Sequence, residues 1–400
     1  MAGGLIPLAE AQARLLALAT AKPAVGLELP GAIGHVLATP LLANRSQPAA
    51  DLSAMDGYAV RAANMPGPWT IIGESAAGRP FAGRIAPGDA VRISTGAIVP
   101  DDADTVLVQE DTGIDDHVLT LTGDGPTSPG AHIRRAGHDF ADGAVLALAG
   151  TRVDARLIAL AAMGGHGTLA VHAPVRVVIL STGDELVPPG TPLPSPAHIP
   201  ASNGVMLSAM LQGLPVDVQI PPLLPDRRDV IASALADHRD ADIIVTTGGA
   251  SVGDHDLIQP ALIHSGGSVD FWRIAMRPGK PVMVGRLGNA IVLGLPGNPV
   301  SAYVTALVLL LPLVKTFAGI QQVMPVICQA KAGAAFPANG ARQDFMRAHL
   351  IDGALVPVSS QDSGALSSLA AADVLVIRAP HQPQAEPGDS LDYIALMTAT

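Results

Sequence analysis

The chain has very little cysteine and few aromatic residues. Its 400 residues include one cysteine, Cys328, and only 3% are Phe, Trp or Tyr. A single cysteine excludes an intramolecular disulfide and argues against a cysteine-based metal site. Hydrophobic residues still make up 48% of the sequence, so the cores must be built from Ala, Val, Leu and Ile. This composition is typical of a globular rather than a disordered chain, and we expect a reducing, cytoplasmic location.

Positive charge is also scarce. There are 24 Lys and Arg against 35 Asp and Glu, which gives a formal net charge of −11, and no run of basic residues occurs. Because binding to a phosphate backbone requires a basic surface, we expect no nucleic-acid partner. An anionic ligand must therefore be bound by a few placed cations and by backbone amides.

Long hydrophobic runs are nearly absent. The first eight residues lack the positive start and apolar block of a signal peptide. The longest apolar run, residues 300–314, is shorter than the roughly 20 residues that a membrane span needs and contains Ser301 and Pro312. We therefore expect a buried helix there and no membrane partner.

The order of predicted elements divides the chain. Short strands between Gly, Pro and Asp turns predict a small β-rich domain over residues 46–141. Strands and helices then alternate over residues 174–320, which predicts a doubly wound parallel α/β domain. After residue 320 short strands return and predict a C-terminal β domain over residues 321–400. A length of 400 residues suits two to four domains.

A glycine-rich turn is the centre of the α/β region. The apolar strand 243–245 ends in small residues, including Gly248, Gly249, Ser251 and Gly253, and Asp254 and Asp256 follow. If a helix begins near Asp254, the exposed amides form a cradle for an anion, and the two carboxylates can hold a hard cation or orient a water. The alternative is an ordinary tight turn. The turn is neither a Walker A loop nor a dinucleotide fingerprint.

Two other predicted strands of the α/β region end in similar turns, at residues 181–185 and 294–299. The carboxyl ends of parallel strands lie at one edge of a sheet, so the three turns should converge on one site. Asp184 and Glu185 in the first turn suit a ligand or Mg2+ contact, or a helix cap, and capping is favoured from the local sequence alone. Asp226 is also a candidate helix cap, and Ser202 or Asn203 another.

Three cations lie close together in residues 271–282. They are Arg273, Arg277 and Lys280, and Pro278 and Pro281 stiffen the loop. Such a loop can hold an anion or can simply be solvated, and the sequence alone favours neither.

Seven segments, taken together and in order, resemble the molybdopterin molybdenumtransferase family, which includes bacterial MoeA and the E domain of gephyrin. In residues 53–59 the sequence reads Ser-Ala-Met-Asp-Gly-Tyr-Ala, and in 294–301 it reads Gly-Leu-Pro-Gly-Asn-Pro-Val-Ser. The other matching segments are residues 92–97, 134–139, 180–186, 247–253 with Asp256, and 277–281. The matches cover nearly the whole chain.

The resemblance implies an elongated homodimer of four-domain subunits. A discontinuous linker domain over residues 1–45 and 142–173 would carry the inserted β-rich domain, and the C-terminal domain would be barrel-like. The implied reaction converts adenylylated molybdopterin and molybdate into molybdenum cofactor and AMP, with Mg2+. The active cleft would combine the α/β domain of one subunit with the inserted domain of the other, and a molybdopterin adenylyltransferase would be a transient partner.

The resemblance also implies roles for individual residues. The catalytic set would be Asp56, Thr95, Asp139, Glu185, Asp226 and Asp256, with Glu185 and Asp256 as metal ligands. Molybdopterin and adenylate would be bound by Thr182, Gly183, Gly248, Gly249, Ser251, Gly253, Pro296 and Asn298. Molybdate would be bound by Arg273, Arg277, Lys280, Arg347 and Ser363.

The sequence departs from the family pattern at a few positions. Arg273 and Arg277 stand where Lys is usual, which keeps the charge but changes its geometry. His138 stands where Glu is usual, and residues 370–372 lack polar side chains. A non-catalytic paralogue that carries molybdate or tungstate, or serves as a scaffold, is an alternative function. A nucleotide-binding regulator is a third, although it would not explain the cationic loop.

Overall fold

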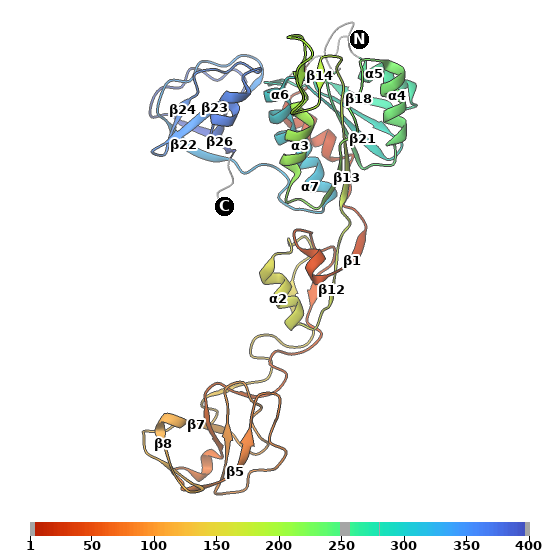
Figure 1. Ribbon diagram of the computed structural model, residues 1–400. Coiled ribbons are helices and arrows are strands. Elements are labelled where there is room, and N and C mark those ends of the chain that lie inside the picture. Colours follow the sequence, from red (N-terminus) through yellow and green to blue (C-terminus); the bar gives the residue numbers. More distant parts are fainter. Residues whose placement is uncertain (1–4, 249–256, 280, 397–400) are drawn as a thin grey trace.

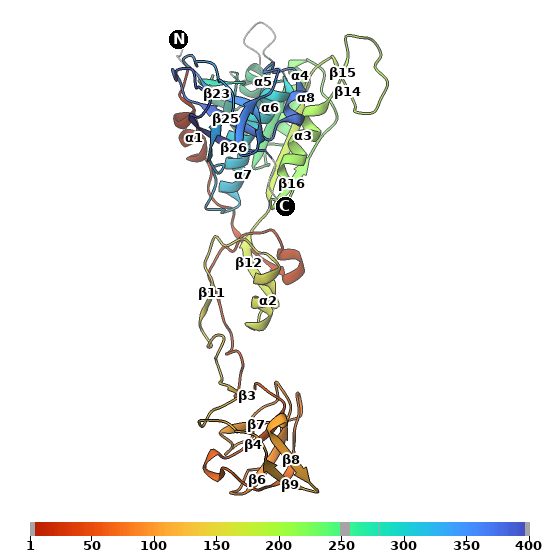
Figure 2. The ribbon, with the colours of Figure 1, turned by 90° about the vertical axis from the view of Figure 1, so that its left-hand side faces the viewer.

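The computed structural model describes residues 5–248, 257–279 and 281–396. The molecule is elongated (Figure 1), with the α/β domain and the C-terminal barrel side by side at one end and the inserted domain at the other. A slender linker domain lies between them, and a view turned by 90° (Figure 2) shows the same order.

The linker domain is built from two separate parts of the chain. Strand β1 (Ala24–Glu28) pairs antiparallel with β12 (Thr168–His172), and β2 (Leu41–Leu42) pairs with β11 (Val145–Ala147). The 3-10 helix η1 (Leu29–Ala32) and helix α2 (Ala155–Met163) complete it. The Asp154 carboxylate caps α2 by accepting a hydrogen bond from the Leu157 amide at 2.9 Å. The chain thus passes through this domain on its way into and out of the insert.

The inserted domain is β-rich, as its closely spaced turns predict. Its six-stranded sheet has the order β7-β4-β6-β5-β9-β8, and β3 pairs with β10 beside it. One apolar cluster contains Val91 and Ile93, and a second contains Trp69 and Leu107. The elements are β3 (Leu52–Ser53), β4 (Gly57–Val60), η2 (Ala62–Asn64), β5 (Trp69–Ser75), β6 (Asp89–Ile93), β7 (Thr105–Val108), η3 (Gln109–Asp111), β8 (Thr112–Asp115), β9 (Val118–Leu121) and β10 (Ile133–Arg134).

The α/β domain has a six-stranded sheet with the order β16-β13-β17-β21-β20-β18. The first four strands are parallel, as predicted, whereas β20 and β18 extend the sheet antiparallel. The strands are β13 (Val175–Ser181), β16 (Val216–Gln219), β17 (Ile243–Thr247), β18 (Ser268–Trp272), β20 (Met283–Leu287) and β21 (Ala290–Leu295); β14 (Leu186–Val187) and β15 (Ile199–Pro200) form a separate pair.

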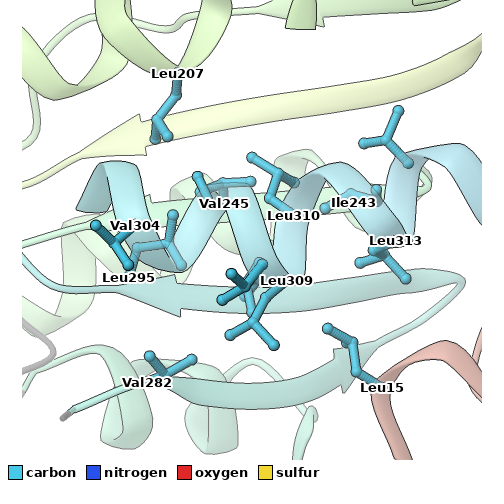
Figure 3. Close-up of a cluster of buried hydrophobic side chains, with 14 of the residues drawn as sticks. Leu15, Leu207, Ile243, Val245, Val282, Leu295, Val304, Leu309, Leu310 and Leu313 are labelled. Carbon is cyan, nitrogen blue, oxygen red and sulfur yellow. The ribbon is translucent and has the colours of Figure 1, made fainter. Parts of the chain in front are cut away.

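Helices cover both faces of this sheet because its strands alternate apolar side chains to either side. Ile243 and Val245 belong to the cluster on one face (Figure 3), and Ile244 belongs to the cluster on the other. The first face carries α1 (Leu8–Leu16), α3 (Ser202–Leu211), α6 (Pro299–Thr305), the π-helical turn η4 (Ala306–Leu310) and α7 (Leu311–Phe317); the second carries α4 (Arg228–Asp237) and α5 (Ile258–His264).

By length and composition alone the continuous helix Pro299–Phe317 could cross a membrane, but 67% of its most apolar 18-residue window is buried in the protein. Val304, Leu309 and Leu313 pack against the sheet in the main core (Figure 3). The predicted buried helix is therefore confirmed, and its apolar character is explained by its place in the core.

The C-terminal domain is a closed five-stranded barrel. Its strands follow the order β23-β24-β22-β26-β25, and β25 pairs back with β23. Strand β19 (Met276–Arg277) of the α/β domain joins β23 in parallel. The elements are β22 (Cys328–Ala332), β23 (Gln343–Ile351), β24 (Ala354–Pro357), α8 (Leu366–Ala371), β25 (Val374–Arg378) and β26 (Ser390–Ala395).

Two predictions about helix starts are wrong. The cap position of α3 is Ala201, with no side-chain cap, rather than Ser202 or Asn203. Helix α4 has Arg227 at its cap position, so Asp226 lies one residue too early. Helix α5 begins at Ile258, and Asp254 lies outside the described residues, so a helix start near Asp254 stays a prediction. Local cap preferences are weak compared with the packing that fixes where a helix meets the sheet.

Candidate functional site

Three strand ends meet at one edge of the α/β sheet. Ser181 of β13 pairs with Thr247 of β17, and Thr247 pairs with Leu295 of β21. The predicted convergence of the three turns is thus confirmed. Gly248 follows β17 with φ +92°, and a Cβ placed there would lie 2.2 Å from the Thr182 carbonyl oxygen. Only glycine permits this close approach of two turns.

A cleft of about 780 Å³ lies between this edge and the C-terminal barrel. A second cavity of about 540 Å³ adjoins it, on the side of helix α3. Both cavities are lined by Glu185, Gly248, Gly297 and Asn298. The α/β domain supplies one wall of the larger cleft and the barrel supplies the other. The barrel wall contains Pro337, Arg342, Asp344, Phe345, Met346, Arg347, Gln361 and Ser363.

Three arginines make the larger cleft cationic. Arg277 extends from β19 and forms an ion pair with Asp344 of the barrel. Arg347 is only 2% exposed, and its Nη1 donates to the Ala365 carbonyl oxygen at 3.2 Å. Burial lowers the pKa of Arg347. The third arginine, Arg342, has no side-chain hydrogen bond or ion pair within the described part of the chain, so its donors are available to a ligand.

The two acidic residues at the end of β13 have different roles. Asp184 accepts a hydrogen bond from the Asp226 amide at 3.1 Å and so ties two loops together. Strand β14 follows, so the prediction of a helix cap is wrong here. Glu185 is exposed and lines both cavities. Gly183, two residues before it, has φ +153°, a backbone conformation that favours glycine.

Three cavity-lining residues have a buried polar atom with no hydrogen-bond partner among the described residues. These atoms are the hydroxyl of Thr182 and the amide oxygens of Asn203 and Asn298. The amide nitrogens are engaged: Asn203 donates to the Gly297 carbonyl at 2.7 Å, and Asn298 donates to the Ser363 hydroxyl at 3.1 Å. Because buried polar atoms are usually satisfied, this group indicates a site for a ligand with hydrogen-bond donors.

The inserted domain brings Asp56 and Thr95 together. The Thr95 amide and hydroxyl both donate to Asp56 Oδ1, at 2.6 and 2.9 Å. These bonds, the amide first, lower the pKa of Asp56. Asp139 is exposed, and its amide donates to the Gln47 carbonyl at 2.9 Å. Within one chain this domain stands at the far end of the molecule from the cleft (Figures 1 and 2).

Some of the remaining predicted site residues line a cavity and others do not. Thr182, Pro296, Asn298, Arg347 and Ser363 line one or both cavities. Arg273 and Asp226 are not among the lining residues of either cavity within the described chain. Five predicted site residues lie outside the described residues: Gly249, Ser251, Gly253, Asp256 and Lys280.

Sequence reasoning missed several residues of the cleft, including Arg342, Asp344 and Gln361. A signal was present, because Asp344 and Arg347 are charged residues within the apolar strand β23. Charged residues in a buried strand are usually paired or functional. Among the described residues no group of three or more His, Cys, Asp and Glu could hold a metal ion.

Models of known protein families match three successive parts of the chain. The family of the MoeA N-terminal region (domain I and II) matches residues 6–165. A probable molybdopterin binding domain matches residues 178–316, and the MoeA C-terminal region (domain IV) matches residues 329–396.

Individual relatives agree with these matches. The molybdopterin molybdenumtransferase of Haemophilus influenzae is 38% identical over 299 residues, which cover 74% of this chain and 73% of the relative. That of Nostoc sp. is 32% identical over 372 residues, covering 88% and 84%. The crystal structure of the molybdopterin biosynthesis MoeA protein from Pyrococcus horikosii superposes with a TM-score of 0.87 at 25% identity, covering 99% of this chain and 100% of that one. The chain therefore belongs to the MoeA family of molybdopterin molybdenumtransferases.

Proposed function

We propose that this protein inserts molybdate into adenylylated molybdopterin and releases AMP. The observation that carries the proposal is the pair of adjoining cavities at the sheet edge, one lined by three arginines and the other almost uncharged, with Glu185 in the wall of both. The substrate has matching parts, because it combines a small oxyanion, a phosphoanhydride and neutral heterocycles.

The larger cleft suits the oxyanion. Arginine presents several N–H groups in one plane, which matches the oxygens of a tetrahedral anion. Arg277, Arg342 and Arg347 approach the cleft from two domains, while Glu185 and Asp344 are its acidic lining residues within the described chain. An excess of positive charge in a protein with net charge −11 indicates a placed anion site.

The adjoining cavity suits an uncharged ring. Glu185 is its one charged lining residue within the described chain, and the amide oxygens of Asn203 and Asn298 are unpaired there. Such acceptors pair with the N–H groups of a pterin or an adenine. The family resemblance implies that Asn298 and Thr182 bind molybdopterin and adenylate, and their position in the wall of this cavity supports that role.

Glu185 also suits a magnesium ion. Mg2+ is commonly held by one or two carboxylates together with substrate phosphates, so a carboxylate in the wall of both cavities fits this ion. Glu185 would hold it together with Asp256. When bound, the ion withdraws charge from the phosphoanhydride. Arg347 is fixed by burial and by its bond to Ala365, so it would hold molybdate without reorganising, and the side chains of Asn298 and Ser363 would fix the neighbouring wall.

The second half of the site is proposed to come from another copy of the chain. Asp56, Thr95 and Asp139 lie in the inserted domain, far from the cleft of their own chain (Figure 1). A homodimer in which each insert reaches the partner's cleft would bring them to the substrate. A transient contact with a molybdopterin adenylyltransferase would supply the intermediate, in the cytoplasm.

The test is metallation of purified adenylylated molybdopterin in vitro, with AMP release measured in the presence of molybdate, tungstate or neither, with and without Mg2+. We expect Mg2+-dependent AMP release that requires the oxyanion. Glu185→Ala should reduce it by roughly 100-fold or more, as expected for loss of a group acting on the transition state. Asp270→Ala, which removes a carboxylate paired with Arg286 elsewhere in the same domain, should leave it unchanged. Oxyanion binding without AMP release would instead support the carrier or scaffold function.

A further inference from the structure

One ion pair crosses the cleft between the α/β domain and the barrel. Arg277 and Asp344 are register partners in the parallel pairing of β19 with β23. The Arg277 Nε donates to Asp344 Oδ2 at 2.9 Å, and Nη2 donates to the same oxygen. The side chain of Asp344 is 7% exposed, whereas that of Arg277 is 55% exposed. The carboxylate is therefore a buried anchor and the guanidinium faces the cleft.

The geometry leaves one edge of Arg277 for a ligand. A guanidinium has five N–H groups, and the pair with Asp344 occupies those on the Nε side. The Nη1 donors have no partner among the described residues, and Arg277 lines the cleft. A lysine has a single nitrogen and could not present one fixed edge to Asp344 and another to an anion.

The backbone of Asp344 is held on two sides. It is in register with Arg277 of β19 and with Arg378 of β25. Its side chain is also 7% exposed, so the carboxylate has little room to turn toward the solvent. Asp344 thus remains in place while Arg277 is oriented by it.

We propose that Asp344 is the positioning residue of the anion site: it holds one edge of the Arg277 guanidinium across the domain junction so that the other edge faces the oxyanion. This inference rests on the proposed function, because it names the residue that prepares its oxyanion site. The opposite role is that of a counter-charge, in which Asp344 weakens anion binding by neutralising Arg277. The two roles predict changes of opposite sign.

The experiment measures equilibrium binding of molybdate, by dialysis and metal analysis, to the full-length protein and its variants. We expect Asp344→Asn to weaken binding by roughly tenfold, as for loss of a charge-assisted hydrogen bond. Arg277→Gln should weaken it at least as much, and the double variant should be no weaker than Arg277→Gln alone, because the two residues act as one unit. Arg277→Lys should fall between wild type and Arg277→Gln.

The matched control is Arg286→Gln with Asp270→Asn, a second Arg–Asp pair that joins β20 to the edge strand β18 and lines neither cavity. It should leave molybdate binding unchanged. Unchanged or tighter binding by folded Asp344→Asn would overturn the proposal, as would additive effects in the double variant. If Asp344→Asn does not fold, as judged by circular dichroism, Arg277→Lys decides, and wild-type affinity in that variant overturns the proposal.

A kinetic readout separates this inference from the proposed function. In AMP release, Asp344→Asn should raise the KM for molybdate roughly tenfold and change the KM for adenylylated molybdopterin by less than about twofold. Equal changes in both would indicate a general structural role and would overturn the inference while leaving the function intact. If wild-type protein binds molybdate but releases no AMP, the proposed function is contradicted but the role of Asp344 is not. The molybdate-binding measurements on the variants would still test that role.

Discussion

The α/β domain has two junctions with the rest of the chain, and they are built differently. Toward the barrel, Phe345, Leu369 and Leu375 belong to the same apolar cluster as the sheet, and β19 pairs with β23. Toward the linker domain, the apolar cores of the described residues are separate. Polar contacts there include the ion pair of Lys22 with Asp242 at 2.5 Å and a hydrogen bond from Arg152 to the Gly213 carbonyl.

This difference fits the division of the site. A cleft that binds a small anion needs walls at fixed distances, and a shared apolar core provides them. The acidic residues of the insert lie on a domain that is joined to the α/β domain through a narrow junction (Figure 2). Such a junction allows a partner subunit to set the position of these residues. The barrel junction therefore builds the cleft, and the linker junction leaves the insert available to a partner subunit.

The largest effect should come from separating the two halves of the site. Asp56→Asn and Glu185→Ala should each abolish most AMP release when assayed alone. If the halves come from different subunits, coexpressing or reassembling the two variants should restore roughly a quarter of wild-type activity, because half of the dimers are mixed and each has one intact site.

The control for this experiment is a mixture of Glu185→Ala with Arg277→Gln, two variants affecting the same wall of the same cleft. It should give no more activity than the two variants measured separately. Equal recovery in both mixtures, or none in either, would contradict a cleft completed by the partner's insert.

An intermediate effect should distinguish the two junctions directly. Phe345 is 3% exposed at the barrel junction, so Phe345→Ala should lower the free energy of unfolding by about 3–5 kcal/mol. Arg152→Gln removes one exposed polar contact at the linker junction and should cost less than about 1 kcal/mol. Urea unfolding followed by circular dichroism measures both. Similar losses in the two variants would mean that the junctions do not differ as described.

The smallest effect concerns acidity in the insert. Hydrogen bonds from the Thr95 amide and hydroxyl lower the pKa of Asp56 below its ordinary value of 3.8. Because the folded pKa is the lower one, the associated stabilisation is present above the unfolded pKa and is lost as the pH falls through the folded value. Thr95→Val should raise the pKa of Asp56 part of the way back, and Thr95→Ser should not. Carbon-13 NMR titration of the Asp56 carboxylate measures its pKa. Identical titration curves for the Thr95→Val variant and wild type would show that the Thr95 hydroxyl does not lower this pKa.

Much of the site could be predicted from the sequence because its parts are local. Gly248 and Asn298 lie in turns directly after apolar strands, and parallel strands bring such turns to one edge. The family resemblance assigned a site role to Glu185 and not to Asp184, and the structure adds that Asp184 accepts a hydrogen bond from the Asp226 amide. The cap predictions for α3 and α4 were wrong because packing outweighed local preference.

The sequence by itself determined the strand-and-helix alternation, the apolar core helix and the small residues that the turns require. These depend on side-chain periodicity and on backbone freedom, which are properties of short segments. Only the tertiary structure decided that Arg277, Arg342 and Asp344 share one cleft and that Asp56 stands far from it. The reason is physical: Arg277 of β19 and Asp344 of β23 are 67 positions apart in the chain, and such contacts depend on how two domains pack rather than on the sequence near either residue.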